Sequence, residues 1–230
     1  MLISDRLKRL RYSTRNFFGS NQYCYPLVSL NPKLKDWMVY PNTDICIEGF
    51  PRSGNSFVHQ AFQLFNPKAK VAHHIHVPMQ VMKAIQYSIP AVVIIRNPLH
   101  ATGSSLLSHP HLDSDLILKN YINFYKKLMP FRSQFFSVSF EDATQNFPNL
   151  VMSVNQIYRT EFLCDAMTDS NIKKIFMKIE EQHETNHQPQ HMIALPTKEK
   201  EELKDGIYKK IKQSYFISNA EEIYKEFLKN

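Results

Sequence analysis

Residues Asp44–Phe57 read D-I-C-I-E-G-F-P-R-S-G-N-S-F, and the architecture of the chain follows from this stretch. A short apolar run at 45–47 precedes a turn that carries Gly49 and Gly54, and a helical pattern follows the turn. A strand, a glycine-spaced loop and a helix in this order are typical of phosphate sites, because loop amides and a helix N-terminus surround one anion. We therefore expect a phosphate group at this loop.

One residue of the loop separates it from the loops that bind nucleoside triphosphates. Gly49-x4-Gly54 followed by Asn55-Ser56 differs from that pattern at a single position. Asn55 stands where the lysine that reaches the β- and γ-phosphates would be. The loop is suited to phosphate but poorly equipped for phosphoryl transfer. A P-loop kinase or nucleoside triphosphatase is therefore the alternative enzyme.

The composition indicates one globular domain with a basic surface. The chain has 230 residues, 43% of them hydrophobic, and a formal net charge of +7, which favours anionic partners. Nucleotides, nucleic acid, acidic glycans and anionic lipids all fit that charge. We find no interleaving of aromatic and basic residues of the kind that binds single strands, and we expect no nucleic-acid partner. A non-catalytic anion-binding protein is a further alternative.

The cysteines and the apolar runs bear on location. Three cysteines lie far apart without a C-x-x-C motif, which indicates reduced thiols and a cytoplasmic protein. No apolar run approaches the ~20 residues that cross a bilayer. Ile3, Leu7 and Leu10 recur at helical spacing among basic residues. We expect a basic helix that packs on the domain, and the alternative is peripheral contact with a membrane surface.

Apolar runs alternate with helical patterns along the chain, which predicts an α/β fold. We expect a three-layer P-loop-type domain, with a central parallel sheet between helices and a helical C-terminal part. We divide it into a basic helical extension (1–40), a nucleotide-binding core (41–160) and a helical region (161–230). Strands are expected at 45–47, 70–74, 91–95 and 135–140. Helices are expected at 55–65, 77–87, 99–107, 114–128 and from 147 onward, with a polar break near 182–196.

A second phosphate signal follows the most apolar strand. Arg96 comes directly after Ala91–Ile95, at the end of a parallel strand, where such sheets bind ligands. Its guanidinium matches the geometry of a phosphate group. Ser104 lies eight residues later and could donate to the same phosphate. The alternative is a surface arginine and an ordinary helix serine.

Together these signals resemble the sulfotransferases that use 3′-phosphoadenosine 5′-phosphosulfate (PAPS). In that family F/Y-P-[KR]-S-G-[TN]-[TS]-[WF] binds the 5′-phosphosulfate, and R-N-P with a serine eight residues beyond the arginine binds the 3′-phosphate. This chain has F-P-R-S-G-N-S-F at 50–57 and R-N-P at 96–98, and the resemblance spans 43–158. It implies two separate cationic pockets that grip opposite ends of PAPS. The residues that it assigns to co-substrate binding are Arg52, Ser53, Gly54, Asn55, Ser56, Phe57, Arg96, Ser104 and Phe140.

The resemblance also implies catalytic roles. H-I-H-V-P at 74–78 is similar to the family segment K-[ST]-H-[LV]-P, whose histidine deprotonates the acceptor hydroxyl. His76 is therefore the candidate base, and His74 replaces the family lysine. Arg52 would stabilise the charge that develops on the departing phosphate. The acceptor would be a hydroxyl or amine of a glycan, a lipid headgroup or a small metabolite. Such transfer needs no metal, and the alternative for the histidines is a strand-end cluster satisfied by backbone hydrogen bonds.

The two phenylalanines have weaker assignments. Phe57 matches the family aromatic that stacks on adenine, and Phe140 resembles the aromatic of the Y-E-D segment. The alternative for both is ordinary core. The R-K-G segment of animal cytosolic members is missing, and the tail at 194–199 resembles shorter bacterial-type members instead. Lys198 or Lys200 is our candidate for the missing phosphate contact.

His183–His187 spells H-E-x-x-H, the pattern of a zinc-protease helix. Polar residues surround it, a proline soon follows, and the glycine of the extended motif is absent. We interpret it as a polar, mobile segment rather than a metal site.

Overall fold

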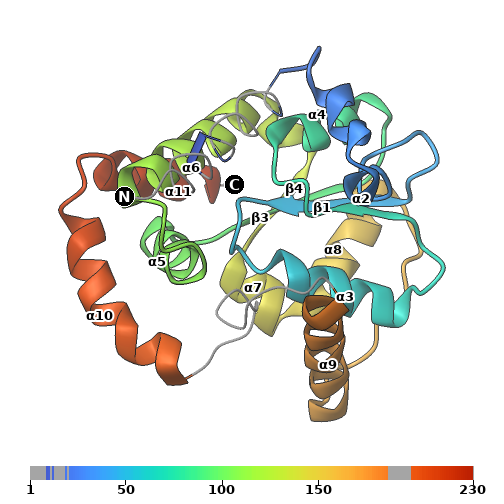
Figure 1. The fold of residues 1–230 in the computed structure, drawn as a ribbon. Coiled ribbons are helices and arrows are strands. Elements are labelled where there is room, and N and C mark those ends of the chain that lie inside the picture. Colours follow the sequence, from blue (N-terminus) through green and yellow to red (C-terminus); the bar gives the residue numbers. More distant parts are fainter. Residues whose placement is uncertain (1–8, 11, 13–18, 20, 186–197, 230) are drawn as a thin grey trace.

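The computed structural model describes residues 9, 10, 12, 19, 21–185 and 198–229. A four-stranded parallel sheet in the order β2-β1-β3-β4 lies at its centre (Figure 1). The strands are β1 (Ile45–Gly49), β2 (Val71–His73), β3 (Ala91–Ile95) and β4 (Phe136–Ser139).

Helices precede, connect and follow the strands. Among the described residues, 3₁₀ helices occur at η1 (Tyr25–Leu30) and η2 (Met129–Gln134). The α-helices from α2 to α6 are α2 (Pro32–Lys35), α3 (Asn55–Phe65), α4 (Pro78–Gln86), α5 (Pro98–Ser108) and α6 (Ser114–Leu128). The others are α7 (Phe140–Gln145), α8 (Phe147–Tyr158), α9 (Asp169–Thr185), α10 (Lys198–Lys212) and α11 (Ile217–Phe227).

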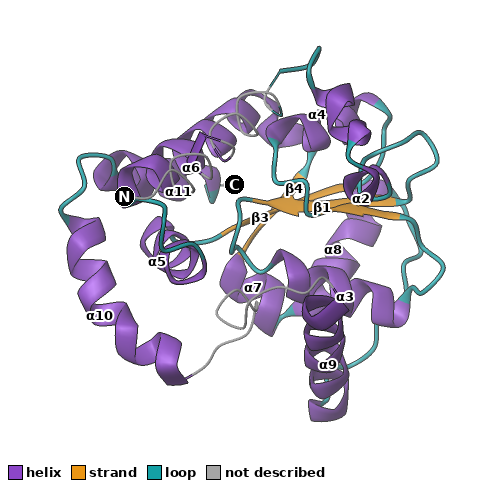
Figure 2. Cartoon of the chain, in the orientation of Figure 1, coloured by secondary structure: helices purple, strands orange, loops and turns teal. Residues whose placement is uncertain are grey.

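The strand β3 is buried on both faces, as its uninterrupted apolar sequence predicts. Val93 and Ile95 belong to one core cluster, which also contains apolar residues of α4, α6 and α11. Val92 and Ile94 belong to a second cluster, with residues of α3, α8 and α9. Helices therefore cover both faces of the sheet, with α4 and α6 on one side and α3, α7 and α8 on the other (Figure 2).

Local signals set where the helices near the site begin. Pro98 occupies the first turn of α5, and the side chain of Asn97 accepts a hydrogen bond from the amide of Leu99. Asp113 caps α6 in the same way through the amide of Leu116. These are the residue types that satisfy the free amides of a first helical turn.

The segment before β1 is joined to the core by a buried amide. Gln80 is fully buried; its Oε1 accepts from the amide of Val39, and its Nε2 donates to the carbonyl oxygen of Trp37. The expected helix at the N-terminus lies mostly outside the described residues. Arg9 is described and forms an ion pair with Asp113 at 3.2 Å. Among the helices that the structure describes, none is both long enough and apolar enough to cross a membrane.

The prediction of helix from 147 onward is wrong for one segment. Arg159 ends α8 in a left-handed conformation, and residues 160–168 are not helical. Two asparagine side chains hold this segment: Asn155 bonds both the amide and the carbonyl of Phe162, and Asn66 does the same for Leu163. These side-chain amides supply the hydrogen bonds that a helix would otherwise provide.

The predicted polar break also begins too early. The helix α9 continues to Thr185, and His183 is a buried residue within it. Residues 186–197, which include His187, lie outside the described residues. The other predicted elements agree with the structure to within about two residues. The chain has the expected α/β fold, a three-layer P-loop-type domain with a central parallel sheet.

Candidate active site

The candidate residues gather at one edge of the sheet. Four segments follow the carboxyl ends of the four strands: the loop after β1, His74 to His76 after β2, Arg96 after β3 and Phe140 after β4. Strand β2, the next strand in the sequence, pairs with one side of β1, and β3 pairs with its other side. Parallel sheets of this kind bind ligands at such a switch point.

The loop after β1 forms a tight turn that leads into α3. The amide of Ser53 donates to the carbonyl oxygen of Phe50 at 3.2 Å, and Nδ2 of Asn55 donates to the same oxygen at 3.1 Å. Gly54 has φ +89°, a conformation that favours glycine. A Cβ at Gly54 would also lie 2.9 Å from the ring of Phe140, so this position requires glycine twice over. The side chain of Asn55 is turned into the loop, where it holds the turn.

Arg52, Arg96 and Ser104 lie together. Nη1 of Arg96 donates to the carbonyl oxygen of Arg52 at 2.9 Å, and Nε of Arg52 donates to Oγ of Ser104 at 2.9 Å. The guanidinium of Arg96 lies 4.0 Å from the centre of the Phe140 ring, a cation–π contact. We expected two separate cationic pockets; in the structure the residues assigned to them are in direct contact.

Two like charges within this site repel each other. Burial, with a smaller contribution from Arg96, lowers the pKa of Arg52 to about 10. Both guanidiniums are charged at neutral pH. An anion placed between them would relieve the repulsion and bond to both.

Ser56 and Phe57, in the first turn of α3, point to different surroundings. Oγ of Ser56 lies 3.0 Å from Nε2 of His74, so the serine joins the loop after β1 to the loop after β2. The ring of Phe57 meets the ring of Phe176 on α9 edge-on at 6.1 Å. Phe57 is partly buried against the second core cluster. In this structure it has the contacts of ordinary core, and adenine stacking stays a prediction.

His76 is held by the end of β1. Its Nδ1 lies 2.9 Å from the carbonyl oxygen of Gly49, and since a carbonyl only accepts, Nδ1 carries the proton. Nε2 is then the proton acceptor of the neutral ring. The same Nδ1 is 3.6 Å from Oε2 of the Glu48 carboxylate. This arrangement suits a general base whose charged form is stabilised by a neighbouring carboxylate.

Glu48 is a site residue that the sequence analysis missed. It is fully buried in β1, and its carboxylate accepts from the amide of Ile75 at 2.7 Å and from the amide of His76 at 3.1 Å. Burial of a carboxylate is costly unless hydrogen bonds compensate, so these contacts fix the loop firmly. The signal in the sequence was a glutamate at the end of an otherwise apolar strand.

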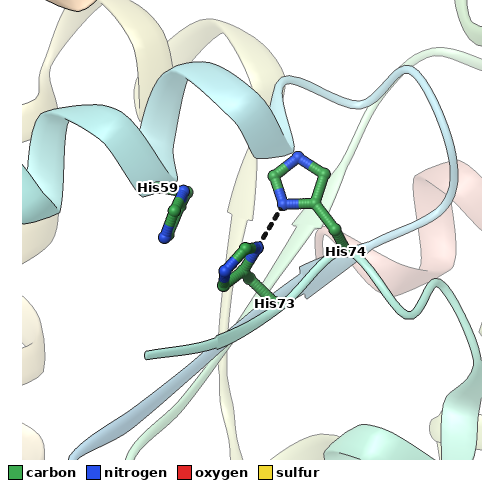
Figure 3. Close-up of side chains that lie close together, drawn as sticks. All are labelled: His59, His73 and His74. Atoms are coloured by element: carbon green, nitrogen blue, oxygen red, sulfur yellow. Dashed lines mark hydrogen bonds between the residues drawn. The ribbon is translucent and has the colours of Figure 1, made fainter. Parts of the chain in front are cut away.

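Three histidines form a cluster beside this loop. Nδ1 of His73 and Nδ1 of His74 are 2.6 Å apart, and the ring of His59, on α3, stacks on His73 with 3.6 Å between centres (Figure 3). Burial, with a smaller effect of His74, lowers the pKa of His59 to about 3. Burial and the other histidines also lower the pKa of His73 well below its usual value. Both rings are therefore neutral at pH 7.

Backbone strain concentrates at this edge of the sheet. Arg52, His74 and His76 have φ values of 69°, 57° and 56°, in the left-handed region that non-glycine residues seldom adopt. Each such residue costs of the order of 1–3 kcal/mol, and such residues cluster at functional sites.

The C-terminal part reaches the site through α5. Helix α10 packs against α5, which carries Ser104. Burial lowers the pKa of His100, also on α5, with further contributions from Arg96 and from Lys204 of α10. The side chains of Lys198 and Lys200 lie outside the described residues. Lys204 of α10 is described, and its positive charge acts on His100 of α5.

Comparisons with known proteins give matches among solved structures. Neither a protein-family model nor a curated protein matches the chain. A crystal structure of mouse sulfotransferase SULT7A1 complexed with PAP matches with a TM-score of 0.44 and 13% sequence identity. The match covers 84% of this chain and 93% of that chain. Because both values are low, the function proposed below rests on the contacts of this chain's own residues.

Proposed function

We propose that this protein is a sulfotransferase, which moves a sulfuryl group from PAPS to a hydroxyl or amine acceptor. The observation that carries this proposal is the direct contact between the two sequence motifs. Arg96 bonds the main chain of Arg52, and Arg52 bonds Ser104. Residues far apart in the sequence thus form one cationic site at the N-terminus of α3, which suits a doubly phosphorylated nucleotide.

The site would bind the two ends of the nucleotide differently. The amides of the loop at 50–55 and the start of α3 face the 5′ end, and Arg96 and Ser104 hold the 3′-phosphate. Arg52, between them, exchanges its bond to Ser104 for one to the nucleotide. Its charge stabilises the 5′-phosphate as it leaves, which is where negative charge grows in the transition state.

In the transfer step, the acceptor oxygen or nitrogen attacks sulfur in line with the bond that breaks. A new bond to sulfur forms, and the bond between sulfur and the bridging oxygen of the 5′-phosphate breaks. The acceptor proton moves to Nε2 of His76. Glu48 and the carbonyl of Gly49 stabilise the imidazolium through Nδ1. The products are the sulfated acceptor and 3′,5′-adenosine bisphosphate (PAP).

The same residues disfavour a kinase. Asn55 takes the place of the P-loop lysine, and its amide is bonded to the carbonyl of Phe50. The position after β3 holds Arg96 rather than a carboxylate that would bind Mg²⁺. We further propose a cytoplasmic location and a glycan, lipid headgroup or small metabolite as acceptor.

Calorimetric titration tests the nucleotide assignment. PAP, ATP and adenosine 5′-monophosphate are titrated separately into the full chain in the same buffer. We expect PAP to bind at least about 10-fold more tightly than the monophosphate, because the 3′-phosphate adds charge-assisted bonds worth about 1.5–3 kcal/mol. Binding of ATP as tight as that of PAP would overturn the proposal.

A further inference from the structure

The histidine cluster brings together three nitrogen donors from two elements. His59 comes from the middle of α3, His73 ends β2, and His74 follows it (Figure 3). One ring nitrogen from each lies within 4.8 Å of the other two. The sequence places His59 fourteen residues before His73, so the fold and not the local sequence makes this group.

The contact between His73 and His74 has a chemical consequence. Their Nδ1 atoms are 2.6 Å apart, and only one proton fits between two ring nitrogens at that distance. A metal ion can replace that proton and use both lone pairs. Two nitrogens bound to one zinc ion in a tetrahedral site are about 3.3 Å apart, because each Zn–N bond is about 2.0–2.1 Å. The pair needs to open by only about 0.7 Å to reach that spacing.

The surroundings of the cluster fit a bound ion. Nε2 of His74 lies 3.0 Å from Oγ of Ser56, and a metal-bound histidine commonly donates its second ring N–H to such an acceptor. His59 and His73 are 7% and 8% exposed, so their orientation is set by packing. The ring of Trp37 lies 5.2 Å from that of His73 and 6.1 Å from that of His74, which places an indole beside the cluster.

We propose that His59, His73 and His74 bind one divalent transition-metal ion of the zinc class. Imidazole nitrogen is a preferred ligand for such ions, and three histidines leave a fourth position for water or another ligand. The ion would tie α3, which begins at the phosphate loop, to the end of β2, which leads to His76. It would be a structural or regulatory ion beside the reaction, since sulfuryl transfer as proposed here does not use it.

The experiment uses the full chain after treatment with a chelator and removal of the chelator. Co²⁺ is titrated first, because its visible d–d absorption reports coordination by nitrogen, and Zn²⁺ is then added to displace it. Trp37 is the sole tryptophan of the chain, so quenching of its fluorescence by Co²⁺ or Cu²⁺ reports binding at this place. We expect one equivalent to bind, to quench Trp37, and to raise the temperature of thermal unfolding when the ion is Zn²⁺.

Two variants and a matched control locate the ion. His59→Ala removes a buried ligand, and His74→Gln removes a partly exposed one whose loss the fold tolerates better. We expect each to weaken Zn²⁺ binding by about 100-fold or more, since loss of even an outer partner costs about 10- to 100-fold. The control is the double variant His109→Ala/His111→Ala, which removes a histidine pair from another loop, with 5.8 Å between ring centres. It should bind Zn²⁺ like the parent chain.

Three results would overturn the proposal. The first is no saturable binding of Co²⁺ or Zn²⁺ by the parent chain. The second is binding that His74→Gln leaves intact or that the control variant abolishes. The third is a sulfur-to-cobalt charge-transfer band, which would place the ion on a cysteine. Near-ultraviolet circular dichroism of each variant shows whether it is folded, and if His59→Ala is not, His74→Gln alone decides.

Discussion

Arg96 donates from Nη1 to the main-chain carbonyl oxygen of Arg52 at 2.9 Å, so the residue after β3 holds the loop after β1. The loop at 50–55 and Arg96 are therefore coupled before any ligand arrives. The face of the same guanidinium rests on Phe140. The guanidinium of Arg96 thus contacts both the Arg52 carbonyl oxygen and the Phe140 ring, and these two contacts fix its orientation. Such preorganisation lowers the entropy that is lost when an anion binds.

Replacement of Arg96 tests this coupling. We expect Arg96→Ala to weaken PAP binding by about 10- to 100-fold, because a charge-assisted hydrogen bond contributes about 1.5–3 kcal/mol. Arg96→Lys should recover only part of the loss, since an ammonium lacks the planar fork. Calorimetry measures both affinities. Arg159→Ala removes the same charge from an exposed residue and should bind PAP normally; weakening equal to that of Arg96→Ala would show a general charge effect.

Replacement of His76 separates binding from chemistry. In His76→Ala we expect the rate of PAP formation from PAPS, in the presence of an acceptor, to fall by about 10²- to 10⁴-fold. The affinity for PAP should stay within about twofold, since His76 bonds Gly49 and Glu48 rather than the cationic site. His100→Ala, which removes a histidine from α5, serves as the comparison. An unchanged rate in His76→Ala would assign the base to another residue.

Glu48 is expected to matter for stability. Glu48→Ala removes the acceptor for the amides of Ile75 and His76, and each unsatisfied buried amide costs about 1–3 kcal/mol. We expect the free energy of unfolding to fall by about 3 kcal/mol or more, as measured by urea denaturation. Glu48→Gln keeps one acceptor oxygen and should lose less. The exposed Glu161→Ala should change stability by less than about 0.5 kcal/mol, and an equally small effect of Glu48→Ala would contradict the assignment.

Two helical glycines, Gly103 of α5 and Gly206 of α10, provide a matched pair. A Cβ at Gly103 of α5 would lie 2.6 Å from the ring of Tyr208, while a Cβ at Gly206 of α10 meets nothing within 4 Å. Gly103→Ala should therefore displace α10 and destabilise the chain by about 1–3 kcal/mol. Gly206→Ala should stabilise it by about 0.5–1 kcal/mol, since alanine favours a helix over glycine. Thermal unfolding of both variants checks the sign; destabilisation by both would show that α10 is not packed as described.

The fold followed from the sequence where apolar patterns were uninterrupted. The strand Ala91–Ile95 could be predicted because all its residues are buried in the fold and its sequence is therefore apolar without interruption. The helix Asn55–Phe65 could be predicted because the glycine-spaced loop marks its start. The segment at 160–168 escaped prediction because Asn66 and Asn155, which hold it, lie before it in the sequence. Side-chain amides that replace helical hydrogen bonds leave no periodic signal.

The site followed from the sequence only in part. The motifs named Arg52, Arg96, Ser104 and Phe140, and the structure brings these four together. Their role in PAPS binding stays a prediction. Glu48 and His59 were missed, because their importance comes from contacts with 73–76 across neighbouring strands and a helix. Phe57 packs against Phe176 of α9 in the core. Phe176 lies more than a hundred residues later in the sequence, so no local pattern near Phe57 predicts this contact.

The left-handed conformations of Arg52, His74 and His76 set stability and chemistry against each other. Glycine at any of these positions would relax the backbone by roughly 1 kcal/mol and would also delete a guanidinium or an imidazole. Screening for heat-resistant variants alone would therefore reward the loss of groups that the proposed transfer and the proposed metal site use. Any engineering of this protein toward ruggedness has to leave these three positions untouched and seek its gains elsewhere, for instance on the exposed surface of α10.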